Sequence, residues 1–246
     1  MSNAINRPML IGIGLGPGDP ELVTVKAARL LSQSTAIAYF AKEGRIGHAR
    51  TIAAPYLKSG IKELPLLYPV TTEIHFADKT YNDKMSIFYE HCATSIRTVL
   101  QSGESVSLLC EGDPLLYGSF MHMFDRLKDE FDVDVCAGLS GMSGCFAAAR
   151  QPMTWGDDIL TVIPATLDEQ MLLDHLNRTN AAVIMKLGGN FEKVRHVLTQ
   201  SKLASRAIYV EHGTMQNQKI LPFNDKKDDL APYFSMVIVP GDGRRP

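Results

Sequence analysis

Short apolar runs alternate with longer amphipathic patterns along the first half of the chain. The first apolar run covers 9–15, a pattern with helical spacing follows at 22–31, and the alternation continues to an apolar run at 133–136. Such an alternation favours βαβ units, in which the strands pair in parallel and helices cover the faces of the sheet. The predicted strands are 9–15, 36–41, 61–67, 106–110 and 133–136, and the predicted helices are 22–31, 49–58, 81–100 and 118–128.

The pattern restarts after residue 137. A helix is predicted at 140–150, a connection with proline, tryptophan and glycine follows at 151–158, and apolar runs then alternate with only two helical patterns. We interpret this half as a mixed α/β unit whose pattern also allows antiparallel strands. The predicted fold class is therefore α/β with two α/β domains, 1–137 and 138–246. The predicted strands of the second domain are 159–163, 181–186, 206–211, 218–221 and 234–239, and its later helices are 168–177 and 191–201.

The most informative segment joins the first predicted strand to the first predicted helix. Residues 11–20 read IGIGLGPGDP. Glycines let main-chain N–H and C=O groups approach a ligand without interference from Cβ, and Pro17 fixes one φ angle. The segment has neither the Gly-Lys-Ser/Thr of a phosphate loop nor the G-x-G-x-x-G spacing of a dinucleotide site. Taken alone, it is compatible with a small-molecule site and with a tight connection.

Three further glycine-bearing turns follow strand ends or open a helix. Residues 110–119 read CEGDPLLYGS, residues 137–144 read AGLSGMSG and residues 210–215 read VEHGTM. Because the carboxyl ends of parallel strands meet at one edge of a sheet, the loops at 11–20 and 110–119 are expected to face one crevice. The alternative role for Asp113 is to cap its own turn, as Asp does before proline. Four such turns from two domains predict a ligand held between the domains.

Composition narrows the class of protein. The chain has 246 residues, of which 45% are apolar and 21% charged, as in an ordinary folded protein. No apolar run approaches the roughly 18 residues of a membrane span, and the N-terminus lacks the apolar core of a signal peptide. We therefore expect a cytoplasmic protein without a membrane partner. The charged run at 225–229 is expected to be a solvated turn or a helix start.

The four cysteines do not have the spacing of a metal or redox site. Cys92, Cys110, Cys136 and Cys145 contain no C-x-x-C pair, and two of them lie in apolar runs. Buried small side chains are the expected role, and no metal is predicted. The seven histidines are scattered, and at most one is expected to be functional.

The net charge of −2 limits the partners that electrostatics alone would attract. Nucleic acid is not an expected partner, and a polyanionic substrate has to meet a local basic cluster. The strongest such cluster, Lys42, Arg45, His48 and Arg50, lies within nine residues. Arginine binds carboxylates in a bidentate way, which favours the two arginines, although an ordinary exposed helix start has the same composition. The weaker candidates are Lys79, Lys84 and Lys186.

The motifs occur in an order that resembles a known family. G-x-G-x-G-P-G-D near the N-terminus, then G-D-P-L-x-Y-G, then a G-x-S-x-x-S helix start and a late E-x-G-T are similar to the S-adenosylmethionine-dependent tetrapyrrole methylases. The similarity spans nearly the whole chain. One departure is Ala137, where the family usually has proline before the glycine. The stretches 40–50, 111–114, 153–165 and 183–188 resemble the precorrin-2 C(20)-methyltransferases of cobalamin synthesis.

The resemblance implies two α/β domains, a homodimer, and S-adenosylmethionine bound in the cleft between the domains as the methyl donor. It leaves open whether Met185 or Leu187 contacts this cofactor. The predicted cofactor-binding residues are Gly16 and Pro17 in the first loop, Gly112, Asp113 and Leu116 in the second, Ser140 and Gly141 in the third, then Met185 or Leu187, and finally Gly213 with Thr214.

The reaction that the resemblance implies is methylation of precorrin-2 at C(20) to give precorrin-3A. Methyl transfer from a sulfonium is an in-line displacement, which positioning and an apolar cleft can accelerate without a nucleophilic side chain. Asp113 is the candidate base for the proton that leaves the meso carbon, or a cofactor ligand only. The basic cluster at 42–50 is predicted to bind the substrate's carboxylates. Three alternatives remain open. The substrate ring already contains cobalt, the methyl group is added at another ring position, or the protein is a sensor that binds the cofactor without catalysis.

Overall fold

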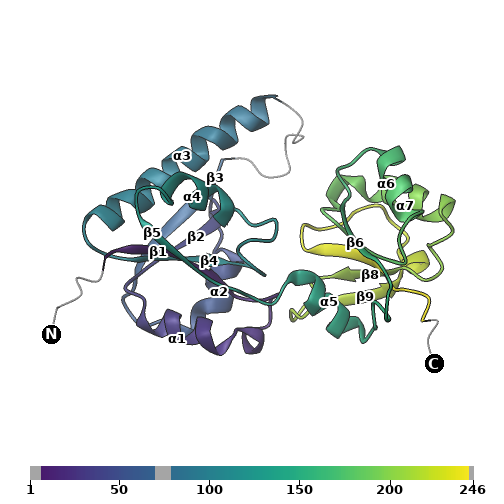
Figure 1. The fold of residues 1–246 in the computed structure, drawn as a ribbon, viewed down its shortest axis with the longest axis horizontal. Coiled ribbons are helices and arrows are strands. Elements are labelled where there is room, and N and C mark those ends of the chain that lie inside the picture. Colours follow the sequence, from purple (N-terminus) through teal and green to yellow (C-terminus); the bar gives the residue numbers. More distant parts are fainter. Residues whose placement is uncertain (1–6, 70–78, 244–246) are drawn as a thin grey trace. The chain divides into compact units, whose positions relative to one another are not determined.

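The chain divides into an N-terminal unit, Met1–Gly141, and a C-terminal unit, Met142–Pro246, each with its own sheet (Figure 1). The computed structural model describes residues 7–69 and 79–243. The division follows Gly141, whereas the sequence pattern placed the domain boundary after residue 137. Of the helices in the described ranges, none is long and apolar enough to cross a membrane.

The N-terminal unit is built on a parallel sheet of five strands in the order β3-β2-β4-β1-β5. β1 and β4 pair so that Gly14 lies opposite Cys110, which brings the carboxyl ends of these two strands level. β1 is apolar because strands of such a sheet are covered on both faces. The strands are β1 Met9–Gly14, β2 Ala36–Lys42, β3 Lys62–Tyr68, β4 Val106–Cys110 and β5 Asp132–Cys136.

Helices cover both faces of this sheet (Figure 1). α1 and α2 lie on one face, where Leu31 packs in an apolar cluster with Ile13. α3 and α4 lie on the other face, where Ile96 and Phe120 pack with Leu10. These two buried clusters hold the sheet between its helices. The helices are α1 Val25–Gln33, α2 His48–Ala53, α3 Lys79–Gln101 and α4 Phe120–Leu127, with short 3₁₀ turns at Pro20–Leu22 and Ala54–Tyr56.

The loop after β1 is held by two consecutive caps. The Asp19 side chain accepts a hydrogen bond from the Glu21 N–H at 2.9 Å and caps the 3₁₀ turn. The Thr24 side chain accepts from the Ala27 N–H at 3.1 Å and caps α1, so this helix begins later than the predicted 22–31. A side-chain oxygen at this position satisfies N–H groups that a helix cannot pair internally. The caps fix the conformation of the loop that follows the central strand.

The C-terminal unit has a mixed sheet of five strands in the order β6-β7-β10-β8-β9. β6 and β7 pair in parallel, and every other pair in this sheet is antiparallel. The mixed α/β character predicted for this half is confirmed. The strands are β6 Leu160–Pro164, β7 Ala181–Met185, β8 Ile208–Glu211, β9 Lys219–Pro222 and β10 Ser235–Val239.

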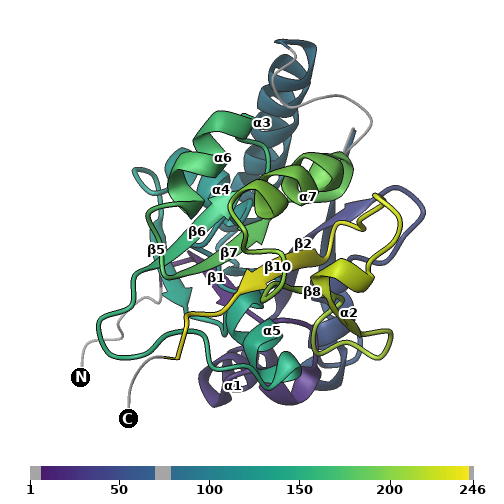
Figure 2. The same ribbon diagram turned by 90° about the vertical axis from the view of Figure 1, so that its right-hand side faces the viewer.

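Helices also pack on both faces of the second sheet. α6 and α7 cover one face, where Leu172 and Val194 join an apolar cluster with Val237 (Figure 2). α5 packs on the other face, where Cys145 lies against Val183 and its neighbours. The helices are α5 Gly141–Ala149, α6 Glu169–Leu176 and α7 Phe191–Gln200, with 3₁₀ turns at Gly188–Asn190 and Phe223–Asp225.

The four cysteines are free thiols in buried positions. Burial raises the pKa of the Cys92 thiol to about 12 and that of Cys145 to about 12. A thiol with a raised pKa is a poor nucleophile and metal ligand, because the thiolate is the reactive form. The prediction that these residues serve as buried small side chains is confirmed.

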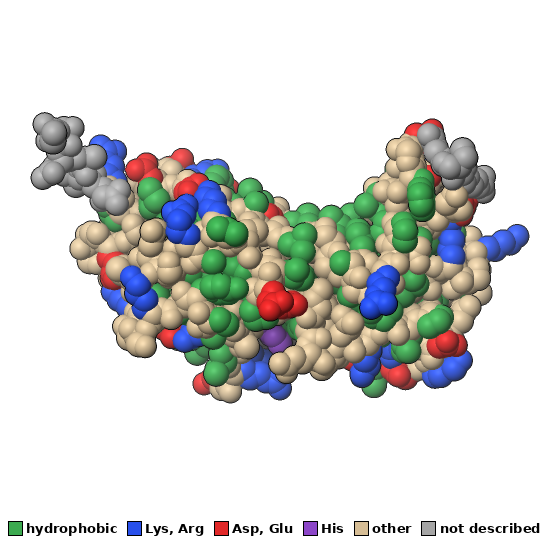
Figure 3. Space-filling view, turned by 90° about the horizontal axis from the view of Figure 1, so that it is seen from below, with side chains coloured by type: hydrophobic (Ala, Val, Ile, Leu, Met, Phe, Trp, Pro, Cys, Tyr) green, Lys and Arg blue, Asp and Glu red, His purple; other side chains and the backbone are tan. Residues whose placement is uncertain are grey.

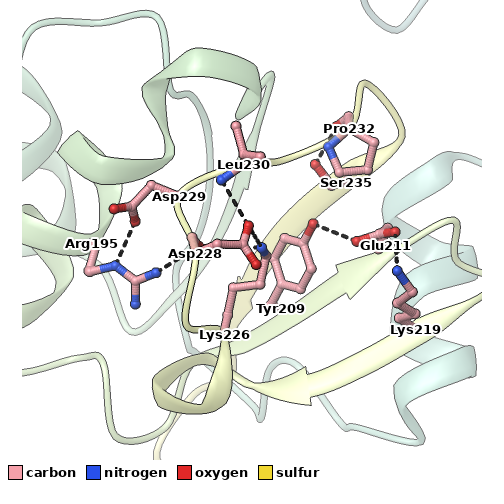
Figure 4. Close-up of polar contacts among 10 residues, drawn as sticks. All are labelled: Arg195, Tyr209, Glu211, Lys219, Lys226, Asp228, Asp229, Leu230, Pro232 and Ser235. Atoms are coloured by element: carbon pink, nitrogen blue, oxygen red, sulfur yellow. Dashed lines mark hydrogen bonds and ion pairs between the residues drawn. The ribbon is translucent and has the colours of Figure 1, made fainter.

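One residue of the charged run 225–229 differs from the solvated turn or helix start that its sequence predicts, while the other four residues are exposed. Lys226 is only 7% exposed, and its ammonium nitrogen lies 5.5 Å from the ring centre of Phe191. The same nitrogen lies 5.3 Å from the ring centre of Tyr209, and Figure 4 shows these two side chains together. The same ammonium binds the side chain and the carbonyl oxygen of Asp228. This hydrogen bond lowers the pKa of Asp228. Aromatic faces and a carboxylate can hold a cation away from water, which the charge pattern alone does not reveal.

Truncation of Lys226 is expected to destabilise the C-terminal unit. Lys226→Ala removes the cation from two aromatic faces and leaves the Asp228 carboxylate without it, at a cost of about 2 kcal/mol in the free energy of unfolding. Lys227→Ala is the matched control, because this neighbour is exposed and donates to the Asn224 carbonyl, so its loss should cost less than about 0.5 kcal/mol. Urea unfolding measures both values, and equal losses would contradict this role of Lys226.

Candidate functional site

The strand order of the N-terminal sheet places a change of chain direction at the ends of β1 and β4. The chain leaves β1 towards β2 on one side of this central pair, and it leaves β4 towards β5 on the other side. Ligands of open α/β sheets bind outside the carboxyl ends of the strands at such a change of direction, because the loops diverge there. The two loops are 15–24 and 111–119, which contain the first two glycine-bearing turns.

The two loops pair with each other beyond the ends of their strands. Gly16 and Gly112 form an isolated antiparallel bridge, in which the Gly112 N–H donates to the Gly16 oxygen at 2.8 Å. The Leu15 N–H donates to the Cys110 oxygen at 2.9 Å just before this bridge. The loops are therefore fixed to one another by their main chains, as a site that must hold a ligand in one orientation requires.

A third loop, which follows β5, packs against the main chains of Gly14 and Gly112. A Cβ added to Gly138 would lie 2.1 Å from the Gly112 oxygen, and a Cβ on Gly14 would lie 2.5 Å from the Gly138 nitrogen. Only glycine allows main chains to approach so closely. We call Gly14, Gly16, Gly112 and Gly138 the glycine junction. Gly14 and Gly138 were not among the predicted site residues. Gly14 is the last residue of β1 and Gly138 follows the end of β5 by two residues, so the signal was a glycine beside each strand end.

Gly16 has a structural role within its own loop. Gly16 has φ +78°, a left-handed conformation that suits glycine. A Cβ at this position would lie 3.0 Å from the oxygen of Leu22 in the same loop. The absent side chain therefore serves the fold of the loop, and the main chain of Gly16 is occupied in the bridge to Gly112.

Asp113 ties the second loop to the third. One carboxylate oxygen accepts from the Leu115 N–H at 2.9 Å and the other accepts from the Gly138 N–H at 3.1 Å. The first bond is the turn cap that the sequence left open as an alternative. The second bond fixes the loop after β5, at the glycine junction. Asp113 therefore supports the site whether or not its carboxylate also takes part in chemistry.

The remaining predicted residues of the N-terminal unit lie around the glycine junction. A Cβ on Gly112 would meet the nitrogen of Gly141 at 3.5 Å and the Cα of Ser140 at 4.0 Å, so the start of α5 adjoins the second loop. Pro17 follows Gly16 directly, and the Leu116 N–H closes a turn onto the Asp113 oxygen at 3.3 Å. The structure thus brings together Gly16, Pro17, Gly112, Asp113, Leu116, Ser140 and Gly141.

Met185 and Leu187, the two alternatives for the cofactor contact at the end of β7, have different surroundings. Leu187 is fully buried in the apolar cluster under α6 and α7. Met185 is partly buried, and its carbonyl oxygen accepts from the Ala165 N–H at 2.7 Å. A side chain sealed in a core cannot touch a ligand, so only the main chain of Leu187 is available for contact.

The turn after β8 contains unusual backbone conformations. His212 has φ +51° and Thr214 has φ +71°, which residues other than glycine seldom adopt. Gly213 lies between them, and a Cβ there would meet the Cys145 sulfur of α5 at 2.6 Å. The Thr214 N–H donates to the Gln218 side chain at 2.8 Å. Strained backbone is retained where surrounding contacts enforce it, often at functional sites.

Polar contacts hold the end of β8 directly before this turn (Figure 4). The Glu211 carboxylate accepts from the Tyr209 hydroxyl at 3.0 Å and pairs with Lys219 at 3.1 Å. Burial raises the pKa of Glu211, but the hydrogen bonds from Lys219 and Tyr209 outweigh it and leave the pKa below its ordinary value. The ionised glutamate of the E-x-G-T motif thus anchors the strand that leads into the turn.

The basic cluster at 42–50 contains three exposed residues and one arginine that is paired within the fold. Lys42 ends β2, Arg45 lies in the following loop and His48 begins α2, and all three are exposed. Arg50 makes a bidentate ion pair with Glu63 of β3, at 3.0 and 2.8 Å, and its hydrogen bond lowers the pKa of Glu63. The guanidinium that was predicted to bind substrate is therefore engaged within the fold.

The weaker basic candidates lie outside this segment. Lys84 is exposed on α3, and Lys186 follows β7 with φ +58°. The side chain of Lys79 lies outside the described residues. Figure 3 shows basic and acidic side chains interspersed on the face it presents, in keeping with the small net charge of −2.

The chain belongs to the tetrapyrrole (corrin/porphyrin) methylases, whose family model matches residues 9–225. A precorrin-2 C(20)-methyltransferase of Sinorhizobium sp is 48% identical over 237 residues, which cover 96% of this chain and 97% of that protein. A cobalamin biosynthesis protein CobIJ of Mycobacterium tuberculosis is 42% identical over 97% of this chain but only 47% of its own length. The predicted family is confirmed.

Solved structures share the fold. A cobalt precorrin-4 methyltransferase, CbiF, has a TM-score of 0.73 at 21% identity, with 100% of both chains covered. A uroporphyrin-III C-methyl transferase of Thermus thermophilus, in complex with S-adenosyl homocysteine, has a TM-score of 0.64 at 18% identity, over 95% of this chain and 97% of that one. The predicted α/β fold class is confirmed.

Proposed function

We propose that this protein methylates precorrin-2 at C(20), with S-adenosylmethionine as the methyl donor, to give precorrin-3A and S-adenosylhomocysteine. The observation that carries the proposal is the 48% identity to a precorrin-2 C(20)-methyltransferase over 96% of this chain. Relatives named for the cobalt-containing ring are 24% and 25% identical. The metal-free ring is therefore the favoured substrate.

The loops around the glycine junction fit the methyl donor. Main-chain groups lie there without covering side chains, and Leu115, Leu116 and Tyr117 of the second loop are 53%, 38% and 45% exposed. A nucleoside joined to an amino acid needs this combination of polar main chain and apolar surface. When bound, the donor supplies a methyl group on a positively charged sulfur. The proposed contacts are those of Gly16, Pro17, Gly112, Asp113, Leu116, Ser140, Gly141, Met185 or Leu187, Gly213 and Thr214.

The residues of the chain contribute positioning and proton acceptance. The bridged loops hold their main chains rigidly, which favours an in-line approach of the reacting carbon. Exposed apolar side chains such as Leu116 exclude water from the reacting atoms. Asp113 is the proposed acceptor for the proton that leaves C(20), because its two N–H bonds leave lone pairs of the carboxylate unused.

The segment 42–50 is the proposed contact for the carboxylates of the ring. Lys42, Arg45 and His48 present exposed basic groups, and Ile46 between them is 74% exposed. An apolar macrocycle edged with carboxylates needs cations beside apolar surface. Arg50 completes the proposed set, although a substrate carboxylate there competes with Glu63.

Charge reversal at Arg45 tests the substrate contact. Arg45→Glu is expected to raise the KM for precorrin-2 about tenfold at low salt and less at high salt, because screening weakens exposed charge interactions. Arg178→Glu makes the same charge change at an exposed position after α6 and should leave the KM within about twofold. An equal rise in both variants, or none in either, would remove segment 42–50 from substrate binding.

Turnover with two rings tests the whole proposal. Purified protein receives S-adenosylmethionine with either precorrin-2 or its cobalt complex, and mass spectrometry follows the ring. Gain of one methyl group by the metal-free ring is expected. Gain by the cobalt ring alone would reassign the substrate, and no gain by either would contradict the proposal. The proposed active form is a cytoplasmic homodimer, and the mass of the active sample in solution reports its oligomeric state.

A further inference from the structure

The helix that follows the basic loop lacks a cap from its own sequence. Gly47 occupies the N-cap position of α2 and provides no side-chain hydrogen bond. A Cβ at this position would lie 2.5 Å from the Phe40 oxygen, so the close approach of the loop to β2 requires glycine. The first N–H groups of a helix have no partner within it. The start of α2 therefore needs an acceptor from elsewhere in the fold.

Glu111 provides this acceptor. Its carboxylate oxygen accepts from the Ala49 N–H at 2.9 Å, across a sequence separation of 62 residues. Glu111 stands directly after β4 and directly before Gly112 of the glycine junction. One side chain thus connects the start of α2 to the loop that carries Gly112 and Asp113.

Glu111 is held in surroundings that disfavour an unpaired carboxylate. Burial raises the pKa of Glu111 above its ordinary value, although hydrogen bonds from the main chain of Glu111 and Ala49 and the proximity of His48 act to lower it. A polar group removed from water is costly unless it is hydrogen-bonded. The bond to Ala49 therefore belongs to the folded arrangement of these two loops and is not an incidental surface contact.

The rest of α2 is also fixed, so the loop before it has little freedom. Arg50 pairs with Glu63 of β3 through two hydrogen bonds. At the other end of the loop, the Arg45 N–H donates to the Lys42 oxygen at 3.0 Å and closes a tight turn. Lys42 is held at the end of β2, whereas the positions of Arg45 and His48 depend on where α2 begins.

We propose that Glu111 is a positioning residue that sets the basic loop 42–48 relative to the loop of Asp113. It acts through Ala49 and determines affinity for the anionic ring, not for the methyl donor. The inference rests on the proposed function for its substrate. The part of the inference that concerns structure, namely that Glu111 anchors the start of α2, depends only on the hydrogen bond from Ala49.

Two variants test whether Glu111 affects binding of the ring and not binding of the methyl donor. Glu111→Ala removes the acceptor, and Glu111→Gln keeps an oxygen that accepts from Ala49. Glu111→Ala is expected to raise the KM for precorrin-2 about fivefold, the effect of losing a helix cap, with the calorimetric affinity for S-adenosylhomocysteine within about twofold. Glu111→Gln should restore the KM to within about twofold of the parent.

Hydrogen exchange at the Ala49 amide gives a readout that does not depend on activity. Exchange should become about tenfold faster in Glu111→Ala and stay near the parent rate in Glu111→Gln. Unchanged exchange in Glu111→Ala would overturn the inference, as would equal KM values in the parent and Glu111→Ala, or a loss of S-adenosylhomocysteine affinity that matches the rise in KM. A parent protein that methylates no ring overturns the proposed function, and with it the substrate role of Glu111, while the exchange rates still decide the anchoring role.

Discussion

Gly138→Ala is expected to abolish detectable binding of S-adenosylhomocysteine and to lower the free energy of unfolding by about 3 kcal/mol. The new Cβ would lie 2.1 Å from the Gly112 oxygen and 2.8 Å from the carbonyl carbon of Gly14. Both are main-chain atoms, which cannot rotate away as a side chain can. The three loops of the glycine junction must therefore move apart to make room for the alanine side chain. Calorimetry measures binding, and urea unfolding measures stability.

Gly189→Ala is the matched control for this change. Gly189 has no described atom within 4 Å of an added Cβ, so the same substitution should alter stability by less than about 0.5 kcal/mol. Its affinity for S-adenosylhomocysteine should equal that of the parent. Parental binding and stability in Gly138→Ala would show that the junction tolerates a side chain and would contradict the close main-chain packing of its loops.

Asp113→Asn is expected to lower turnover about 100-fold, the range found for loss of a general base. Affinity for S-adenosylhomocysteine should fall less, by about fivefold, because the amide oxygen keeps one of two N–H bonds while the amide nitrogen cannot accept the other. A larger loss in turnover than in binding separates proton acceptance from loop support. Steady-state kinetics and calorimetry measure the two quantities.

Asp125→Asn provides the comparison for Asp113. Asp125 is an exposed carboxylate of α4 paired with Lys128, and its replacement should leave both turnover and affinity within about twofold. If Asp113→Asn lowers turnover and affinity by the same factor, Asp113 supports the cofactor loop and a different group accepts the proton.

Hydrophobic periodicity predicted the secondary structure well because burial decides it in this chain. The strand predicted at 106–110 appears as β4 with every residue buried, and the long pattern at 81–100 forms α3. Errors lie at the ends of elements, where side-chain caps decide. Thr24 starts α1 later than the apolar pattern suggests, since its hydroxyl accepts from the Ala27 N–H.

The candidate site was predicted in its loops but not in its long-range contacts. Gly16, Gly112 and Asp113 follow strand ends, so the parallel sheet brings their loops together. The close approach of Gly138 to Gly112 and the bond from Ala49 to Glu111 join segments far apart in sequence. No local pattern encodes such a contact, because each partner alone has an ordinary turn composition.

The burial of Lys226 was not predicted, for a related reason. Lys226 stands in a run of five polar residues that reads as solvent-exposed. Its burial depends on Phe191 and Tyr209, which lie in other elements, and on Asp228 nearby. Tertiary contacts of this kind can override a local charge pattern.

The position of methylation tests the central claim most directly. The protein is incubated with precorrin-2 and with S-adenosylmethionine carrying carbon-13 in its methyl group, and the product is examined by carbon NMR. The proposed function predicts one enriched methyl signal, bonded to the C(20) meso carbon. An enriched methyl on any other carbon, or an unlabelled ring recovered after full incubation, would contradict it.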